Sequence, residues 1–343
     1  MDQKSSILVI YTGGTIGMIQ DKKTGNLRPF NFENIYQLIP VLENFDLKID
    51  FITFNPLIDS SNVQPPFWIR LAELIEENYE KYDGFVVLHG TDTMAYTASA
   101  LSFLLENINK PVVLTGSQLP LEIVRTDGVQ NIINAIEIAS DCSNRKPIVP
   151  EVTICFENQL LRGNRTSKFN AENFNAFFSG NYPVLAKVGV HIKYTHDLIL
   201  TPNDKKINIH KKLDSNVGIL KLFPGISANL VKSILHTEGL RAVILETYGS
   251  GNAPTDKWFI DMLKEAIARN IIIYNVTQCY QGSVEIGKYE TSTYLGRIGV
   301  IGGYDITTES ALTKMMFLLG CEYSNEEIIQ LLQTSLRGEM TIV

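Results

Sequence analysis

The 343-residue chain has few cysteines and few histidines, and neither type forms a recognisable pattern. Its four cysteines show no CxxC pair and no regular spacing, which predicts free thiols in a reducing cytosol rather than a disulfide framework. Among the five histidines, His191 and His196 are five positions apart, so they do not share a helix face as paired metal ligands would. We therefore expect no metal and no cofactor.

Long apolar segments and excess positive charge are also missing. The apolar run at 7–11 is too short for a signal peptide or a membrane span, and no later stretch approaches about 18 apolar residues. Acidic residues outnumber basic ones by 37 to 30, whereas a nucleic-acid-binding face needs clustered lysine and arginine. These absences predict a cytoplasmic protein that acts on a small neutral or zwitterionic molecule, with no nucleic acid and no membrane as partner.

Short apolar runs alternate with amphipathic helical patterns in the first half of the chain. The runs predict buried strands, and the segments with apolar residues at helical spacing predict helices between them. The predicted strands are 7–11, 84–88, 111–114 and 151–156, and the predicted helices are 67–79, 94–106 and 128–140. This alternation predicts a mainly parallel sheet with helices on both faces.

A polar segment, 190–215, separates the two halves and is predicted to be a linker. Beyond it, the predicted strands are 217–222, 242–245 and 271–276, and the predicted helices are 228–236, 258–269, 310–319 and 325–335. The predicted fold class is α/β. A larger N-terminal domain, 1–189, would hold the mainly parallel sheet, and a smaller C-terminal α/β domain would occupy 216–343.

Glycine stands beside threonine, serine, aspartate or asparagine after each of the first four predicted strands. The clusters are Thr12–Thr15, His89–Thr93, Thr115–Gln118 and, past the fourth strand, Arg162–Lys168. Parallel strands end at one edge of a sheet, where open α/β folds bind ligands. One such cluster is typical of a turn, and Asp92–Thr93 is also typical of a helix N-cap. Four clusters at one edge predict a small-molecule site.

Two of these clusters, TGGTI at 12–16 and HGTDTM at 89–94, resemble the signatures of the bacterial-type asparaginase/glutaminase family. The resemblance covers nearly the whole chain, and the segments 248–254 and 300–303 are similar to the cytoplasmic, type I branch. It implies an amidohydrolase that converts L-asparagine to L-aspartate and ammonia. The reaction would use a threonine nucleophile, through a β-aspartyl-enzyme or by direct displacement, in a homodimer or homotetramer.

The resemblance also implies a role for each matching residue. The catalytic set would be Thr15 as nucleophile with Thr91, Asp92 and Lys168, where the lysine takes a proton through Thr91. Which threonine takes which step stays open. The substrate would be held by Asp59, Ser60, Ser61, Thr91, Asp92 and Ser117, and by Asn252 of a neighbouring subunit.

The sequence departs from the family pattern in two places. The mobile loop of the family carries a tyrosine near the nucleophile, and the matching stretch 25–30 has none. Some cytoplasmic members bind a second asparagine at a regulatory site, which Thr277, Gln278 and Cys279 match, but Glu246 replaces its arginine. A glutamate repels the carboxylate that the arginine would bind. We therefore expect a hyperbolic or weakly sigmoidal dependence of rate on L-asparagine, unless a cation such as Arg241 compensates.

Two alternatives belong to other functional classes. An asparaginase-like subunit of an archaeal tRNA amidotransferase would carry an extra N-terminal domain, for which a first strand at residue 7 leaves no room. An amino-acid-binding protein with a dead site would have no need of the intact threonines and lysine. Ammonia release from L-asparagine without ATP or tRNA distinguishes these alternatives from a hydrolase.

Overall fold

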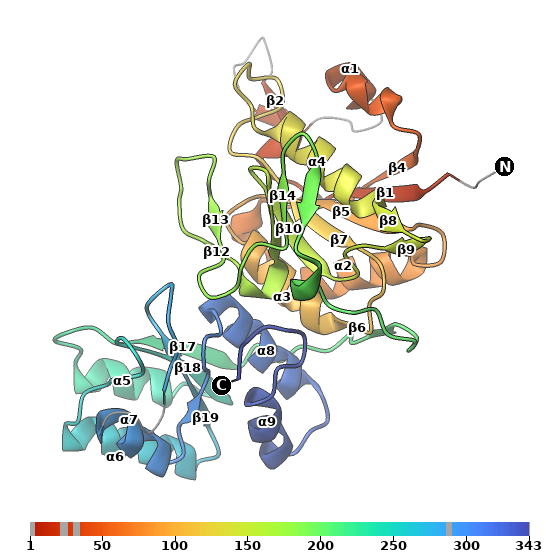
Figure 1. Cartoon of the computed structure of the whole chain (residues 1–343). Helices are drawn as coiled ribbons and strands as arrows, with labels where there is room; N and C mark the ends of the chain where they lie inside the picture. Colours follow the sequence, from red (N-terminus) through yellow and green to blue (C-terminus); the bar gives the residue numbers. More distant parts are fainter. Residues whose placement is uncertain (1–3, 21–26, 30–34, 286–289, 343) are drawn as a thin grey trace. The chain divides into compact units, whose positions relative to one another are not determined.

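The computed structural model describes residues 4–20, 27–29, 35–285 and 290–342, which form two compact units, 1–211 and 212–343 (Figure 1). Within the described residues, the first unit is built on an eight-stranded, mainly parallel sheet and the second on a four-stranded parallel sheet. Both units carry helices between strands, as the apolar patterns indicated. The predicted α/β fold class is confirmed.

The four strands predicted in the first half lie side by side at the centre of the large sheet. Across the sheet the order is β15 (Ile192–Tyr194), β14 (Ala186–Val188), β11 (Gln159–Arg162), β10 (Val152–Phe156), β7 (Val112–Thr115), β5 (Gly84–Leu88), β1 (Ser6–Tyr11) and β4 (Lys48–Thr53). The pairs from β4 to β10 are parallel, whereas β11, β14 and β15 are antiparallel additions at one side. The parallel order brings the ends of β1, β5 and β7 to one edge.

Alternate residues of the central strands face two different helical layers. Ile7 and Val9 belong to one apolar core with α4 (Gly128–Ser140) and α1 (Ile35–Leu38). Because side chains alternate along a strand, Leu8 and Ile10 face the opposite side, and they too are fully buried. That side is covered by α2 (Pro65–Asn78) and α3 (Met94–Leu104), so helices cover both faces as predicted (Figure 1).

Short two-stranded antiparallel pairs complete the first unit. They are β2 (Met18–Gln20) with β3 (Leu27–Pro29), β8 (Cys142–Ser143) with β9 (Lys146–Pro147), β12 (Ser167–Lys168) with β13 (Phe177–Phe178), and β6 (Leu105–Glu106) with β16 (Asn208–Ile209). The predicted helix 94–106 therefore stops at Leu104, where the chain turns into β6. The predicted linker 190–215 contains β15 and β16, and both strands pair within the first unit.

The second unit alternates strands and helices as far as α8 (Thr308–Gly320), which is followed by α9 (Asn325–Leu332). Its sheet has the order β17 (Val217–Lys221), β18 (Ala242–Thr247), β19 (Ile272–Thr277) and β20 (Ile301–Gly302). Its helices are α5 (Ala228–Leu235), α6 (Lys257–Ala268), α7 (Glu290–Arg297), α8 (Thr308–Gly320) and α9 (Asn325–Leu332). Within the described residues, no helix has the length and apolar character needed to cross a bilayer.

A fully buried ion pair fixes the C-terminal segment of the second unit. Lys314 Nζ on α8 lies 2.6 Å from Glu339 Oε1, and both side chains are 0% exposed. The carboxylate also accepts hydrogen bonds from the backbone N–H groups of Leu336 and Arg337, at 3.0 and 2.7 Å. Each charge is therefore neutralised and hydrogen-bonded, as a buried charge requires.

Candidate active site

Three loops at the carboxyl edge of the large sheet pack backbone against backbone. Gly14, in the loop after β1, has a φ of +84°, and a Cβ there would strike the backbone of Gly90 in the loop after β5. A Cβ on Gly90 would in turn strike the side chain of Ser60, in the loop after β4. Only glycine allows this approach. Thr15 and Thr91, the residues after the two glycines, are therefore carried by loops in direct contact.

Thr15 begins a short 3-10 helix, η1 (Thr15–Gly17), directly after Gly14 in the loop that follows β1. The loop is anchored at Thr12, whose N–H and hydroxyl both donate to Leu88 O, at 3.0 and 2.9 Å. The Thr15 side chain is half-buried, and within the described part of the chain its hydroxyl makes no hydrogen bond. The hydroxyl is thus held on a fixed loop and open to a ligand.

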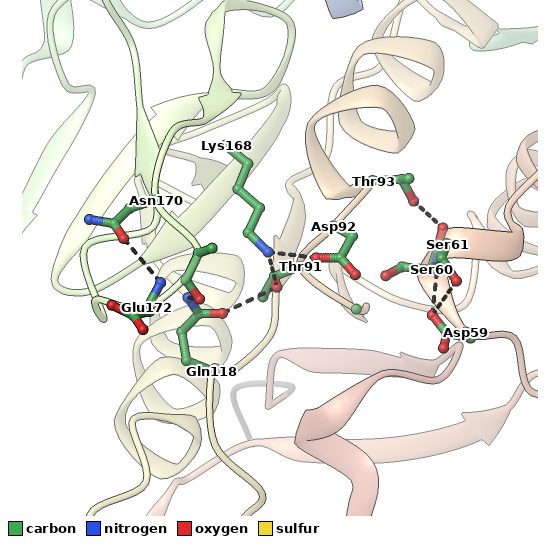
Figure 2. A network of polar contacts seen from close by, with 12 residues as sticks. Asp59, Ser60, Ser61, Thr91, Asp92, Thr93, Gln118, Lys168, Asn170 and Glu172 are labelled. Carbon is green, nitrogen blue, oxygen red and sulfur yellow. Dashed lines mark hydrogen bonds and ion pairs between the residues drawn. The ribbon is translucent and has the colours of Figure 1, made fainter.

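Thr91, Asp92 and Lys168 form one polar cluster (Figure 2). Lys168 Nζ donates to Thr91 Oγ1 at 2.8 Å and lies 2.7 Å from Asp92 Oδ1. The lysine side chain is 17% exposed and that of Asp92 is 63% exposed, so the lysine is mostly covered while the carboxylate reaches solvent. The structure thus brings together three of the four predicted catalytic side chains.

Gln118 had no predicted role, yet it joins this cluster (Figure 2). The Thr91 hydroxyl, which accepts from the lysine, donates to Gln118 Oε1 at 3.2 Å. The amide orientation follows from its other end, because Nε2 donates to Ala171 O and Asn173 O at 3.3 and 3.1 Å. Its position directly after Ser117 in the third cluster was the only signal for it in the sequence. Gln118 therefore fixes the direction of the Thr91 hydroxyl.

Lys168 reaches the site by a different path from the predicted one. The chain turns at Glu157 and Asn158, which have φ values of +46° and +62°, and β11 then runs antiparallel to β10. The fourth strand end therefore does not lead directly into the site. Lys168 instead stands on the β12–β13 hairpin, where it pairs with Phe177.

The predicted substrate loop is tied to the start of α3. Asp59 caps a 3-10 helix, η4 (Ser60–Asn62), by accepting hydrogen bonds from the N–H and the hydroxyl of Ser61, both at 3.0 Å. Thr93 Oγ1 donates to Ser60 O at 2.6 Å, so this loop is joined directly to the Thr91 loop (Figure 2). Ser117 is 3% exposed and its hydroxyl donates to Leu119 O at 2.6 Å, which shapes its own loop.

Asn252 lies in the second unit, in a tight loop after β18. Tyr248 and Asn252 form a β-bridge with two backbone hydrogen bonds of 2.9 and 2.8 Å. Thr277 Oγ1 donates to Gly249 O at 2.6 Å and closes the loop from β19. Asn252 is thus presented from a well-braced turn.

The four residues of the predicted regulatory site also lie in the second unit. Glu246, near the end of β18, accepts from Thr308 Oγ1 at 2.7 Å and lies 3.2 Å from Lys221 Nζ. Gln278 Nε2 donates to Leu222 O and Glu246 O at 2.6 and 2.9 Å, and the Cys279 N–H donates to Thr277 Oγ1 at 3.0 Å. Arg241 precedes β18, at the other end of the strand, and pairs with Asp214. The cation beside Glu246 is therefore Lys221.

The tyrosine-free loop 25–30 is described only at Leu27–Pro29, and residues 25, 26 and 30 lie outside the described residues. Among the described residues, no group of three or more histidine, cysteine, aspartate or glutamate side chains is placed to hold a metal ion.

Comparison with known families identifies the class to which this arrangement belongs. The family described as "Asparaginase, N-terminal" matches residues 6–200, and the "Glutaminase/Asparaginase C-terminal domain" matches residues 216–332. The chain belongs to the asparaginase family of amidohydrolases, and the resemblance stated from its motifs is confirmed.

Individual relatives agree with this assignment. The chain is 43% identical to L-asparaginase 1 of Escherichia coli K12 over 341 residues, which cover 99% of each chain. It is 40% identical to the crystal structure of L-asparaginase I from Vibrio cholerae, with a TM-score of 0.89 and coverage of 99% and 100%. A 60 kDa lysophospholipase of Mus musculus is 38% identical, and the match covers 64% of that protein.

Proposed function

We propose that this protein hydrolyses L-asparagine to L-aspartate and ammonia, with Thr15 as the nucleophile. The observation that carries the proposal is the Thr91–Asp92–Lys168 cluster, held on a loop that packs against the loop of Thr15. Two hydroxyls, a lysine and a carboxylate at one sheet edge are suited to a small zwitterion whose side-chain amide is to be cleaved. The full-length match to proteins named L-asparaginase supports the substrate.

The proposed chemistry assigns each group a separate task. Thr15 Oγ1 attacks the amide carbon, the C–N bond breaks and ammonia leaves, while Thr91 with Lys168 moves the hydroxyl proton toward the leaving group. Water then hydrolyses the resulting β-aspartyl ester, which releases L-aspartate and restores the Thr15 hydroxyl. Asp92 binds the substrate α-ammonium, while Asp59, Ser60 and Ser61 hold the end that carries the α-carboxylate. Backbone N–H groups beside Gly14 and Gly90 would stabilise the oxyanion that forms during attack.

Ammonia release by the purified protein tests this function directly. L-asparagine and L-glutamine should be assayed in parallel, without ATP or tRNA, together with Thr15→Val. Release from L-asparagine that is lost in Thr15→Val supports a threonine hydrolase. If no ammonia is released without ATP and tRNA, the amidotransferase alternative is favoured. If asparagine binds but is not hydrolysed, an amino-acid-binding protein with an inactive site is favoured. Wild-type turnover in Thr15→Val would exclude Thr15 as the nucleophile.

The proposed active enzyme is a cytoplasmic homo-oligomer. Asn252 stands on a braced turn of the second unit, and its proposed role is to complete the site of a neighbouring subunit. A dimer or a tetramer satisfies this arrangement. Sedimentation at assay concentrations should therefore find at least a dimer, and a fully active monomer would contradict the role given to Asn252.

We also propose that the second site around Thr277, Gln278 and Cys279 no longer binds asparagine tightly. The Glu246 carboxylate occupies this region with its charge engaged by Lys221 and its oxygen bonded by Thr308. An incoming carboxylate would meet this negative charge, and Lys221 is already paired. Arg241, engaged by Asp214 at the far end of β18, is not placed to compensate.

A further inference from the structure

His89 is a buried histidine for which the proposed chemistry has no use. It follows β5 and immediately precedes Gly90, and its backbone N–H donates to Thr115 O at 2.9 Å. The residue is 1% exposed, and its ring stacks edge-on against Phe67 with centroids 5.7 Å apart. A polar ring buried this deeply requires a partner for each nitrogen, and both partners are present.

A continuous chain of hydrogen bonds passes through this ring. It begins at Trp68 on α2, whose Nε1 donates to Thr97 Oγ1 on α3 at 3.0 Å. Thr97 Oγ1 lies 3.0 Å from His89 Nε2, and His89 Nδ1 lies 2.7 Å from Gly90 O. Trp68 is 5% exposed and Thr97 is 0% exposed, so water does not compete for these groups.

The groups at the two ends of this hydrogen-bond series, the Trp68 indole N–H and the Gly90 carbonyl, determine which atom donates in every bond between them. An indole N–H can only donate, so the Thr97 oxygen accepts there and its own proton is free for His89 Nε2. A backbone carbonyl can only accept, so His89 Nδ1 must carry the ring proton and donate it to Gly90 O. Burial lowers the pKa of His89 to about 4, which keeps the ring neutral at ordinary pH. One tautomer therefore satisfies every group in the chain.

The last hydrogen bond in this series, from His89 to Gly90 O, controls the orientation of the Gly90–Thr91 peptide. Gly90 O and the Thr91 N–H belong to the same planar trans peptide unit and point in opposite directions. When His89 draws the carbonyl inward, the Thr91 N–H must point to the other side of the loop. Within the described residues, no group accepts a hydrogen bond from that N–H, so it is open to a substrate oxygen.

We propose that His89 is a positioning residue, which holds the Gly90–Thr91 peptide in one orientation through a hydrogen-bond chain that starts at Trp68. This inference rests on the proposed function, because the residue being positioned is Thr91. Loss of the chain should lower kcat and leave KM nearly unchanged, since the substrate-binding loop is anchored separately through Thr93.

Thr97 offers the cleanest substitution, because valine has the same shape without the hydroxyl. Thr97→Val should lower kcat by roughly 10- to 100-fold, the scale expected when a reacting group is misplaced by about 1 Å, with KM within about twofold. Thr97→Ser keeps the hydroxyl and should restore most of the rate. Thr153→Val on β10 is the matched control, because this buried threonine hydroxyl has no hydrogen-bond partner among the described residues.

Substitutions of His89 distinguish a role in positioning the Gly90–Thr91 peptide from a role in core packing. Asparagine can place an amide N–H where Nδ1 lies and still donate to Gly90 O, whereas glutamine reaches the Nε2 position and loses that donor. A positioning role predicts that His89→Asn retains more kcat than His89→Gln. A packing role predicts the reverse, because glutamine is closer to histidine in volume.

Nitrogen-15 NMR of the wild-type enzyme gives a readout that is independent of turnover. The His89 ring should show a protonated Nδ1 and an unprotonated Nε2 at neutral pH. An Nε2–H tautomer, wild-type kcat in Thr97→Val, or a higher kcat in His89→Gln than in His89→Asn would each overturn the proposal. A wild-type enzyme that releases no ammonia from L-asparagine would instead overturn the proposed function, whatever the tautomer.

Discussion

Acid should destabilise the folded protein through His89. The pKa of this histidine falls from 6.5 to about 4 because the ring is fully buried. Between these two pH values the unfolded chain binds a proton that the folded chain does not, so stability declines as pH falls. The contribution of His89 to the stability of the folded protein is complete above about pH 6.5 and is lost progressively as the pH falls to about 4. A gap of about 2.5 pH units corresponds to about 3 kcal/mol.

The assay is urea denaturation of the wild type and His89→Gln across this pH window. The free energy of unfolding of the wild type should fall by up to about 3 kcal/mol more than that of the variant between about pH 7 and about pH 4. Carboxyl groups with lowered pKa, such as Asp50 and Glu339, act in both proteins and cancel in the difference. His191→Gln, at an exposed histidine, controls for the substitution. Parallel curves for wild type and His89→Gln would refute this reasoning.

Four further outcomes follow from the described contacts. Lys168→Met should lower kcat by roughly 10²–10⁴-fold in the ammonia assay, because it removes the proton-transfer group; a rate within about twofold of wild type would contradict that role. Gln118→Leu should lower kcat by about tenfold, since the Thr91 hydroxyl loses its acceptor, and an unchanged rate would show that its direction is unimportant. Initial rates should depend hyperbolically on L-asparagine in the wild type and more sigmoidally in Glu246→Arg; a wild-type Hill coefficient well above one would contradict the second-site proposal. Lys314→Met should lower the free energy of unfolding by about 3–5 kcal/mol, because it leaves the Glu339 carboxylate buried without its cation. The double variant Lys314→Met/Glu339→Leu should lose much less, and an equal loss in both variants would contradict this.

The central strands were predictable because both of their faces are buried. Runs such as 84–88 are continuously apolar, and only a strand between two helical layers requires that. The edge strand β4 (Lys48–Thr53) was missed because it is half-buried and carries lysine and aspartate. The antiparallel strands β11 and β14 are short and lie outside the strand–helix alternation, so the pattern that revealed the parallel strands does not apply to them.

The site was predictable where residues close in sequence share a loop. Thr91 and Asp92 are neighbours in one cluster, and their motif revealed them. Gln118 acts on a hydroxyl 27 positions away in sequence, and its effect depends on how β5 and β7 are placed side by side. Trp68 lies on the buried face of the amphipathic helix α2, and Thr97 lies in α3, which is buried on nearly all sides, so both residues resemble ordinary core positions. Helical periodicity identifies the buried face, and it does not indicate which polar atoms meet across two helices.

Every residue of the segment His89–Thr93 takes part in a contact that holds the loops of the site together. The histidine anchors the loop to the buried hydroxyl of Thr97 on α3, and Gly90 allows the Thr15 loop to approach. Thr91 and Asp92 meet the lysine of the hairpin, while Thr93 ties the loop of Ser60 to the start of α3. Because these five consecutive residues contact four separate parts of the fold, no position is merely a spacer. A turn that only connected a strand to a helix would have no need of this composition.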